Sequence, residues 1–349
     1  MTMTRAGRIT LAMPVYNVEK YVERALLSAL NQDYDNLDIV VVDDKGKDSS
    51  MDIVRRVVAT HQRGKDVRII EHESNMGLGA TRNTAIDNAE GEYIIFMDSD
   101  DYITDDCISK LYSSVIDNGS DMVVGSFDEF MLSGGNGKVF RQVAGSKSGT
   151  DVLYEWISSP LVYVQSWNKL YKTDLLRRNN VRCIPSNRNE DVFFTFQLLK
   201  RVTSVSFVSD ITYHYQTMNP EAITYNMATG VFDEKEHLQY VGILDSMLEY
   251  MREHNLSKDR FLNEYFLWFY RIRIGSAING KGVSYCDKVR YMNQLRSLPI
   301  KSTDFPGMVE GVRRYGMGWL YSVLPARLSM FVYNCRNVLR YGNRYDKKI

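Results

Sequence analysis

The sequence predicts an α/β protein, with a mostly parallel sheet flanked by helices and then a helical C-terminal region. Short β-branched runs alternate with amphipathic helical patterns through about residue 125, an order that is typical of βαβ units. Beyond about residue 230 the pattern is helical to the end, with few strand signals. We therefore expect two domains, a sheet-containing domain over residues 1–225 and a helical region over 226–349.

The first elements follow from their apolar spacing. Residues 8–16, RITLAMPVY, predict a buried strand, and residues 37–44, LDIVVVDD, form a near-continuous β-branched run typical of a strand buried on both faces. The helix between them has apolar residues at helical spacing, namely Val22, Ala25, Leu26, Ala29 and Leu30. The helix after the second strand has Asp48, Ser49 or Ser50 as its candidate N-cap.

The alternation then repeats. The further predicted elements are strands over 67–72, 92–98 and 121–127, a helix over 78–89, and a helix with its apolar face at Ile108, Leu111, Tyr112 and Val115. Residues 133–150 are rich in glycine and serine, which indicates a loop or a hairpin tip. A helix is expected over about 190–201. In residues 261–270, FLNEYFLWFY, apolar side chains cover nearly the whole helix circumference, so we expect that helix to be buried or docked.

The composition excludes several classes of protein. Lysine plus arginine equals aspartate plus glutamate, 43 each, so no overall charge directs the chain towards nucleic acid. The 4 cysteines lie far apart without a CxxC pair, as in a reduced cytosolic protein. The sequence has no apolar run of about 18 residues that could span a membrane, and its N-terminus does not resemble a signal peptide. We expect a cytoplasmic location.

Polar residues stand at the ends of several predicted strands. Asn17 follows the first strand, Asp43 and Asp44 end the second, and Asp98 and Asp100 follow the strand over 92–98. Each residue alone could be a helix cap or a turn former. Because ligands bind beyond the carboxyl ends of the strands in such sheets, we expect this set to form a binding site at one edge.

The stretch FMDSDDYI places Asp98, Asp100 and Asp101 within four positions. Two unit charges about 4 Å apart repel by roughly 4 kcal/mol at an effective dielectric near 20. A divalent cation reverses this cost, and aspartate oxygens suit Mg²⁺ or Mn²⁺. Mg²⁺ commonly takes one or two carboxylates and completes its shell with substrate phosphates. The D-x-D pattern therefore favours a metal-bridged diphosphate.

Other phosphate-binding patterns are missing from the sequence. It contains no G-x-x-x-x-G-K-[ST] loop, and the first strand runs into PVYNVEK where a dinucleotide fold requires G-x-G-x-x-G. The stretch NMGLGATRN opens the third helix and carries Arg82. We expect Arg82 either to contact a phosphate or base, or to be a solvated helix residue.

Two later stretches also carry candidate residues. Glu190 and Asp191 begin a helix, where carboxylates are favoured by the helix dipole but where a rigid general base could also stand. Upstream, the stretch WNKLYKTDLL offers Trp167 for stacking on a sugar and Lys169 for a phosphate. The alternative for Trp167 and Lys169 is a strand-to-helix junction without a ligand.

The motifs PVYN, VVDD, NMGLGATRN, FMDSDD, WNKLY and NED occur in the order expected of a known family. In this order they resemble the family 2 glycosyltransferases, which have the GT-A fold, a Rossmann-like sheet flanked by helices. The resemblance covers about residues 8–225. It implies an inverting transfer of a sugar from a nucleotide-diphosphate donor, commonly a UDP-sugar, to a saccharide or lipid-linked acceptor in surface polysaccharide assembly.

The resemblance also implies roles for the matching positions. The residues that would line the nucleotide pocket are Pro14, Tyr16, Asn17 and Asp43 or Asp44. Arg82 would lie near the base or the phosphates, and Asp98 would contact the ribose or nucleotide. Asp100 would bind the Mg²⁺ or Mn²⁺ ion. Asp191 would take the proton from the acceptor hydroxyl, with Glu190 beside it.

The sequence departs from the family pattern in places. The usual VDDGSxDGS reads VDDKGKDSS, with Lys45 and Lys47 in a loop that is normally neutral. We expect these lysines to be exposed rather than to touch phosphate. His214 lies in a late segment that resembles the family, and it could approach the metal or acceptor or be a half-buried strand histidine.

The C-terminal tail suggests a second kind of contact. Residues 319–333, WLYSVLPARLSMFVY, are apolar and aromatic and lie among basic residues. Such a segment is typical of a peripheral contact with an anionic membrane surface, here the inner face of the cytoplasmic membrane. The alternative is a helix that packs on the protein with its arginines in solvent.

Two other functions stay open from the residues alone. A sugar-nucleotide nucleotidyltransferase also has a Rossmann-like sheet and an acidic metal site. It would need a basic, glycine-rich loop after the first strand, where this chain has MPVYNVEKY. A GT-A fold that only binds is the other alternative, and the intact Asp98, Asp100 and Asp191 argue against it.

Overall fold

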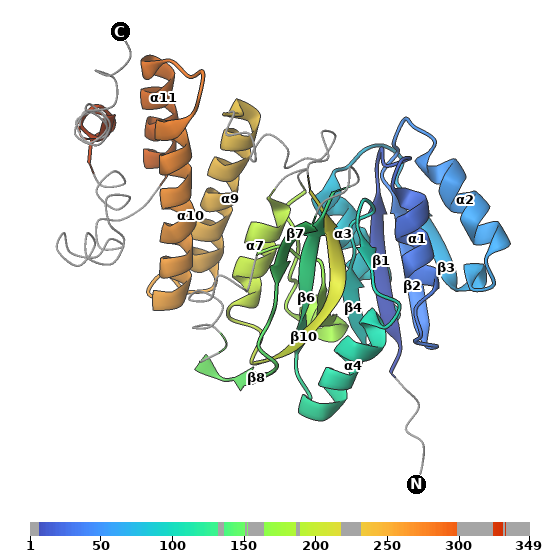
Figure 1. The fold of residues 1–349 in the computed structure, drawn as a ribbon. Helices are drawn as coiled ribbons and strands as arrows, with labels where there is room; N and C mark the ends of the chain where they lie inside the picture. The colour runs from blue at the N-terminus through green and yellow to red at the C-terminus, as the bar shows by residue number, and fades with distance from the viewer. Residues whose placement is uncertain are drawn as a thin grey trace. The chain divides into compact units, whose positions relative to one another are not determined.

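The computed structural model describes residues 7–131, 136–150, 152, 164–185, 189–217, 232–298, 324–330 and 332. The chain divides into two compact units, Met1–Ala222 and Ile223–Ile349 (Figure 1). The first unit is a sheet flanked by helices and the second is helical, which confirms the predicted α/β class with a helical C-terminal region.

One half of the sheet is parallel throughout. Its strands, in spatial order, are β3 (Val67–Glu71), β2 (Leu37–Asp43), β1 (Ile9–Val15) and β4 (Tyr93–Phe96). Ile9 lies beside Leu37 on one side and beside Tyr93 on the other. β2 and β4 are buried along their length, β1 is buried except at the partly buried Pro14, and β3 is partly exposed. Because the four strands run in the same direction, their carboxyl ends lie at one edge of the sheet.

Beyond β4 the sheet is mixed, which differs from the mostly parallel sheet that the sequence predicts. The strands of this half are β9 (Lys169–Lys172), β6 (Met122–Phe130), β10 (Ser204–Gln216), β5 (Tyr102–Ile103), β7 (Asn136–Phe140) and β8 (Gly145–Ser148). β9 runs antiparallel to both β4 and β6, whereas β6 and β10 are parallel. Apolar runs predict where strands lie but not their direction, so the sequence pattern could not reveal this reversal.

Helices cover both faces of this sheet (Figure 1). One apolar core contains alternate residues of β1 and side chains of three helices, α1 (Val22–Leu30), α2 (Ser50–Thr60) and α4 (Cys107–Asn118). Elsewhere in the unit, α3 (Leu78–Asn88) packs against α6 (Thr173–Arg178) and α7 (Glu190–Leu198). The β1 residues in that core are Ile9, Leu11, Met13 and Val15. This alternation is the period of a strand with helices on each side.

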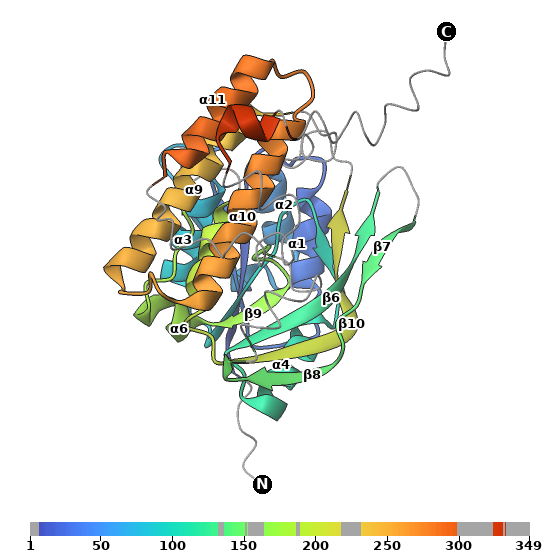
Figure 2. The ribbon, with the colours of Figure 1, turned by 90° about the vertical axis from the view of Figure 1, so that its left-hand side faces the viewer.

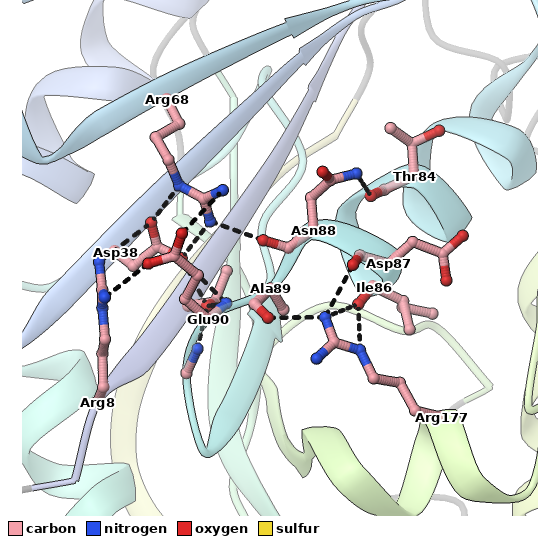
Figure 3. Close-up of polar contacts among 12 residues, drawn as sticks. Arg8, Asp38, Arg68, Thr84, Ile86, Asp87, Asn88, Ala89, Glu90 and Arg177 are labelled. Atoms are coloured by element: carbon pink, nitrogen blue, oxygen red, sulfur yellow. Dashed lines mark hydrogen bonds and ion pairs between the residues drawn. The ribbon is translucent and has the colours of Figure 1, made fainter.

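The C-terminal end of α3 is held by two arginines (Figure 3). Arg177 of α6 donates to carbonyl oxygens at the end of the helix, those of Ile86, Asp87 and Ala89. Arg68 of β3 donates to the carbonyl oxygen of Asn88 at 2.7 Å and binds the buried Asp38 with two nitrogens. These bonds satisfy helix-end carbonyls that have no partner within the helix, so the helix is fixed in position.

Three of the helices in the described part of the second unit pack side by side (Figure 2). They are α9 (Glu234–Glu253), α10 (Arg260–Asn279) and α11 (Tyr285–Arg296). The side chain before each helix accepts hydrogen bonds from backbone N–H groups of the first turn. These N-caps are Asp233, Asp259 and Ser284 respectively. On α10 most of the aromatic residues are buried, as predicted, although Trp268 is 48% exposed.

Within the residues that the structure describes, no helix has the length and apolar character needed to cross a membrane. Of the segment 319–333, for which a membrane contact is predicted, the structure describes residues 324–330 and 332, and the contact stays a prediction.

Candidate functional site

The candidate site lies where the parallel strands end. Val15, the last residue of β1, lies beside Asp43, the last residue of β2. Tyr16 and Asn17 follow β1 and are exposed, while Pro14 within β1 is partly buried. Asn17 has a positive φ of 50°, a conformation that asparagine tolerates better than most residues, and it turns the chain out of the sheet.

Asp44 orders the turn that starts α3. Its carboxylate accepts bonds from the backbone N–H groups of Met76 at 2.8 Å and Gly77 at 2.9 Å, and from the Asn75 side chain at 3.0 Å. The ring of His72 lies 2.7 Å from the same carboxylate. Gly77 has a φ of 90°, which favours glycine. Asp44 is buried, so it acts here as a turn former, one of the readings that the sequence left open.

The loops after β1 and β2 are joined to each other. Asn17 Oδ1 accepts a bond of 2.7 Å from the backbone N–H of Lys47, which joins the two loops. Within the second loop, Asp43 Oδ1 accepts a bond of 2.8 Å from the backbone N–H of Lys45. Lys47 is exposed, as expected. The Lys45 ammonium instead pairs with Glu71 at 2.7 Å, so it is not simply a solvated side chain.

Arg82 of α3 connects the turn after β4 at residues 98–101, here called the acidic turn, with the start of α7. Its Nη2 donates to Asp98 Oδ1 at 2.7 Å, and its Nη1 donates to Glu190 Oε1. The Arg82 side chain is 3% exposed. Burial works against its charge, but Asp98 and other nearby groups outweigh this and raise the pKa of Arg82. Arg82 is therefore a buried cation between two carboxylates, not the solvated helix residue of the alternative.

The start of α7 is held against α3 by two features. A Cβ at Gly79 would lie 1.9 Å from the carbonyl oxygen of Ile184, so only glycine allows this close approach. The amide of Asn83 binds the backbone of Cys183 twice, donating to its carbonyl at 2.8 Å and accepting from its N–H at 2.9 Å. Asn189 then begins α7 with a φ of 58°. Glu190 itself lies against α3, since a Cβ at Gly79 would come within 3.1 Å of the Glu190 Cβ.

Asp191 stands next to Glu190 in the first turn of α7, and the positive charges of Arg82 and Lys169 act on its carboxylate. Burial raises the pKa of Asp191, although the positive charges of Arg82 and Lys169 act in the opposite direction. Lys169 is buried, and its ammonium donates to the carbonyl oxygen of Gln165. Burial lowers the pKa of Lys169 to about 7, against the favourable effect of Asp191. A carboxylate with a raised pKa is suited to accept a proton near neutral pH.

The structure separates the three carboxylates of the acidic turn. Asp101 is fully buried and accepts bonds from Tyr213 Oη at 2.6 Å and from the backbone N–H of Gln216 at 2.7 Å. Burial and then the charges of Asp100 and Asp98 raise its pKa. The backbone N–H of Asp98 also donates to Tyr213 Oη at 3.1 Å. Asp101 thus anchors the turn, and Asp98 and Asp100 are the partly exposed members.

The donor set matches what a hard divalent cation needs when a substrate completes its shell. Among the described residues, no group of three or more histidine, cysteine, aspartate or glutamate side chains could hold a metal by itself. Mg²⁺ needs only one or two protein carboxylates when phosphates supply further oxygens. Asp98 and Asp100 provide two such groups at the carboxyl edge of the sheet.

Trp167 is a core residue in this structure. Its ring stacks on Tyr213 at 4.5 Å and on Tyr215 at 5.3 Å between centroids, and it is 7% exposed. It forms an isolated bridge to Phe96 at the end of β4. This position agrees with the strand-to-helix junction that was the alternative to sugar stacking.

His214 belongs to the strand, not to the acidic turn. Its Nδ1 lies 2.6 Å from Asp128 Oδ1, and its ring stacks on Tyr102 at 4.3 Å. Its side chain is 20% exposed, which is the half-buried strand histidine that the sequence left open.

Sequence reasoning missed the residues that support the acidic turn. Tyr213 and Gln216 lie 112 and 115 positions from Asp101, and no local spacing links residues that far apart. The one available signal is the polar ending YHYQ of β10 at residues 213–216.

Comparison with known proteins gives a consistent result. The sequence model described as "Glycosyl transferase family 2" matches residues 10–179. A glycosyltransferase of Haemophilus influenzae is 31% identical over 196 residues, which are 56% of this chain and 72% of that protein. The poly(ribitol-phosphate) β-glucosyltransferase of Bacillus spizizenii is 33% identical over 213 residues, which are 60% of this chain. The chain spans only 32% of the length of that Bacillus protein.

Among solved structures, residues 1–349 of S. aureus TarS in complex with UDP-GlcNAc have a similar fold. The TM-score is 0.68 with 22% sequence identity, over 94% of this chain and 92% of that one. This likeness supports the GT-A fold.

Proposed function

The chain belongs to glycosyltransferase family 2, and on this premise we propose that it transfers a sugar from a nucleotide-diphosphate donor to a hydroxyl group with inversion. The observation that carries the proposal is the double contact of Arg82 with Asp98 and Glu190. It joins the acidic turn, which suits a diphosphate, to the helix start that carries a candidate base. Family membership also argues against the nucleotidyltransferase alternative.

On the donor side, the exposed Tyr16 and Asn17 at the end of β1 border the nucleotide pocket, together with Asp43. Arg82 fixes the direction of the Asp98 carboxylate, so that Asp98 meets the nucleotide without rearrangement. Asp98 and Asp100 would hold a Mg²⁺ or Mn²⁺ ion, which would supply positive charge against the charge that develops on the leaving diphosphate.

On the acceptor side, Asp191 is the general base. It takes the proton from the acceptor hydroxyl as the hydroxyl oxygen forms a bond to the anomeric carbon. The bond from that carbon to the phosphate oxygen breaks on the opposite face, and the nucleoside diphosphate leaves with the electron pair. Glu190, bound to Arg82, fixes the helix start that carries the base.

The names of the relatives suggest which substrates to test first. The Bacillus spizizenii relative is named for glucosyl transfer to poly(ribitol-phosphate), and the TarS structure holds UDP-GlcNAc. We therefore take a UDP-sugar as the donor, and a saccharide or lipid-linked acceptor of surface polysaccharide assembly as the acceptor. A peripheral contact of residues 319–333 with the membrane belongs to this proposal, because it would bring the enzyme to a lipid-linked acceptor.

The experiment is a thermal-shift series with UDP-glucose, UDP-N-acetylglucosamine and UDP-galactose, each with and without Mn²⁺. We expect one donor to stabilise the wild type in a Mn²⁺-dependent way and Asp100→Ala to remove that dependence. Release of UDP from the same donor in the presence of poly(ribitol phosphate) tests turnover. Binding without release from any donor or acceptor would favour the fold that only binds.

A further inference from the structure

Arg24 of α1 contacts the backbone of the acidic turn, whereas Arg82 contacts its Asp98 side chain. Arg24 Nη2 donates to the backbone carbonyl oxygen of Asp100 at 2.9 Å. The same nitrogen donates to Oε1 of Gln216, the last residue of β10, also at 2.9 Å. One guanidinium therefore connects a helix, a strand end and the acidic turn.

Aromatic rings fix the plane of this guanidinium. It lies over the ring of Tyr102 at 4.9 Å and over that of Phe130 at 4.6 Å. Stacking of this kind restricts a guanidinium more than it restricts a lysine ammonium. Arg24 thus reaches the turn in a defined orientation and not as a solvated surface side chain.

The contact acts on the peptide between Asp100 and Asp101. On one side of this peptide, the Asp101 carboxylate is anchored to β10 through Tyr213 and the backbone of Gln216. On the other side, Arg24 holds its carbonyl oxygen. With both sides held, the backbone dihedral angles that direct the Asp100 side chain have little freedom.

We propose that Arg24 is a positioning residue, which holds the Asp100 carbonyl so that the Asp100 carboxylate is presented to the divalent cation and the donor diphosphate. The inference rests on the proposed function. Partners that orient metal ligands typically account for a factor of 10–100 in metal affinity, so we expect an effect of that size.

The test compares Arg24→Lys with wild type by calorimetric titration of UDP, with and without Mn²⁺. Lysine keeps the charge but cannot make both bonds while stacked on the rings. We expect the Kd for UDP in the presence of Mn²⁺ to rise about tenfold, and the Kd without metal to change less than about twofold. The matched control is Arg56→Lys, since Arg56 pairs with Glu23 at the surface and should leave both constants unchanged.

A purely structural role for Arg24 would lower the melting temperature without changing how strongly Mn²⁺ enhances UDP binding, and this result would overturn the inference. If Arg24→Lys folds too poorly to titrate, Gln216→Met removes the second acceptor and keeps the backbone N–H that binds Asp101. It should weaken the Mn²⁺ enhancement in the same direction, and an unchanged enhancement would again count against the inference. A wild type whose UDP binding ignores Mn²⁺ would instead contradict the metal requirement itself, and the inference would fall with it.

Discussion

Arg82 and Glu190 lie 108 positions apart in the sequence, yet their side chains form a buried ion pair between α3 and α7. The same guanidinium binds Asp98, so two stretches that the sequence shows as separate motifs share one cation. This shared contact places the acidic turn beside the start of α7, a neighbourhood that neither motif predicts by itself.

Removing this shared cation should destabilise the fold. In Arg82→Met, the carboxylates of Glu190 and Asp98 lose their counter-charge while Glu190 stays buried. Such losses cost about 3 kcal/mol or more. Urea denaturation should show a decrease of this size in the free energy of unfolding.

The control for Arg82→Met is Arg56→Met, which breaks an exposed pair with Glu23 and should cost less than about 1 kcal/mol. Equal effects of the two substitutions would mean that the buried contact adds nothing to stability.

Neighbouring carboxylates of the acidic turn should respond differently to the same substitution. Asp101→Asn keeps one acceptor oxygen for the backbone N–H of Gln216, while its amide NH2 can donate to Tyr213 Oη, which then accepts instead of donating. We therefore expect a folded protein that retains Mn²⁺-dependent UDP binding. Asp100→Asn should fold equally well and lose that dependence. Calorimetric titration of both variants checks this, and a loss in Asp101→Asn as large as in Asp100→Asn would refute the separation of roles.

Lys169 should shape the pH dependence of both catalysis and stability. In Lys169→Met, Asp191 loses a nearby positive charge, so its pKa should rise and the acid limb of kcat/KM should move to higher pH. For stability, the folded protein releases the Lys169 proton near pH 7, whereas the unfolded chain keeps it to about 10.4. The wild type should therefore gain stability relative to Lys169→Met as the pH rises from about 7 to about 10.

Lys110→Met is the matched control for Lys169, because Lys110 pairs with Asp106 and Asp210 near the surface. It should leave the acid limb in place. A profile of Lys169→Met that overlays the wild-type profile would remove Lys169 from this role.

His237 should make the helical unit sensitive to acid. It is fully buried, and burial together with the charge of Arg273 lowers its pKa to about 4, against about 6.5 in an unfolded chain. Between these values the unfolded chain binds more protons, so stability falls as the pH falls, by up to about 3 kcal/mol.

The variant that tests this effect is His237→Phe, since the ring already lies among aromatic neighbours, at 5.6 Å from Phe232 and 5.0 Å from Tyr291. The variant should lose less stability than wild type between about pH 6.5 and about pH 4.5. Parallel losses in the two proteins would show that other groups cause the acid sensitivity.

Much of the first unit could be predicted from apolar periodicity. The strands around Ile9, Leu37 and Tyr93 and the helices between them lie where the pattern places them, because buried parallel strands require continuous apolar runs. The direction of β9 could not be predicted, since strand direction depends on how the chain returns to the sheet.

For the site, the sequence predicted which strand ends and loops come together better than it predicted the contacts of each side chain. Asp98, Arg82 and Glu190 do meet. The carboxylates of Asp44 and Asp101, however, accept structural hydrogen bonds from other residues of the protein. Their local sequences look the same as those of the exposed aspartates. The difference arises from partners such as Tyr213, far along the chain, and packing of that kind leaves no local pattern.

The most direct test of the account is the turnover of Asp191→Asn with a UDP-sugar that the wild type uses in the presence of Mn²⁺. We predict that the rate of sugar transfer falls by about 10²–10⁴, while the Kd for UDP stays within about twofold, because the donor contacts of Arg82 and Asp98 remain. A variant that transfers sugar at nearly the wild-type rate would contradict the assignment of Asp191 as the base and, with it, the mechanism proposed for this site.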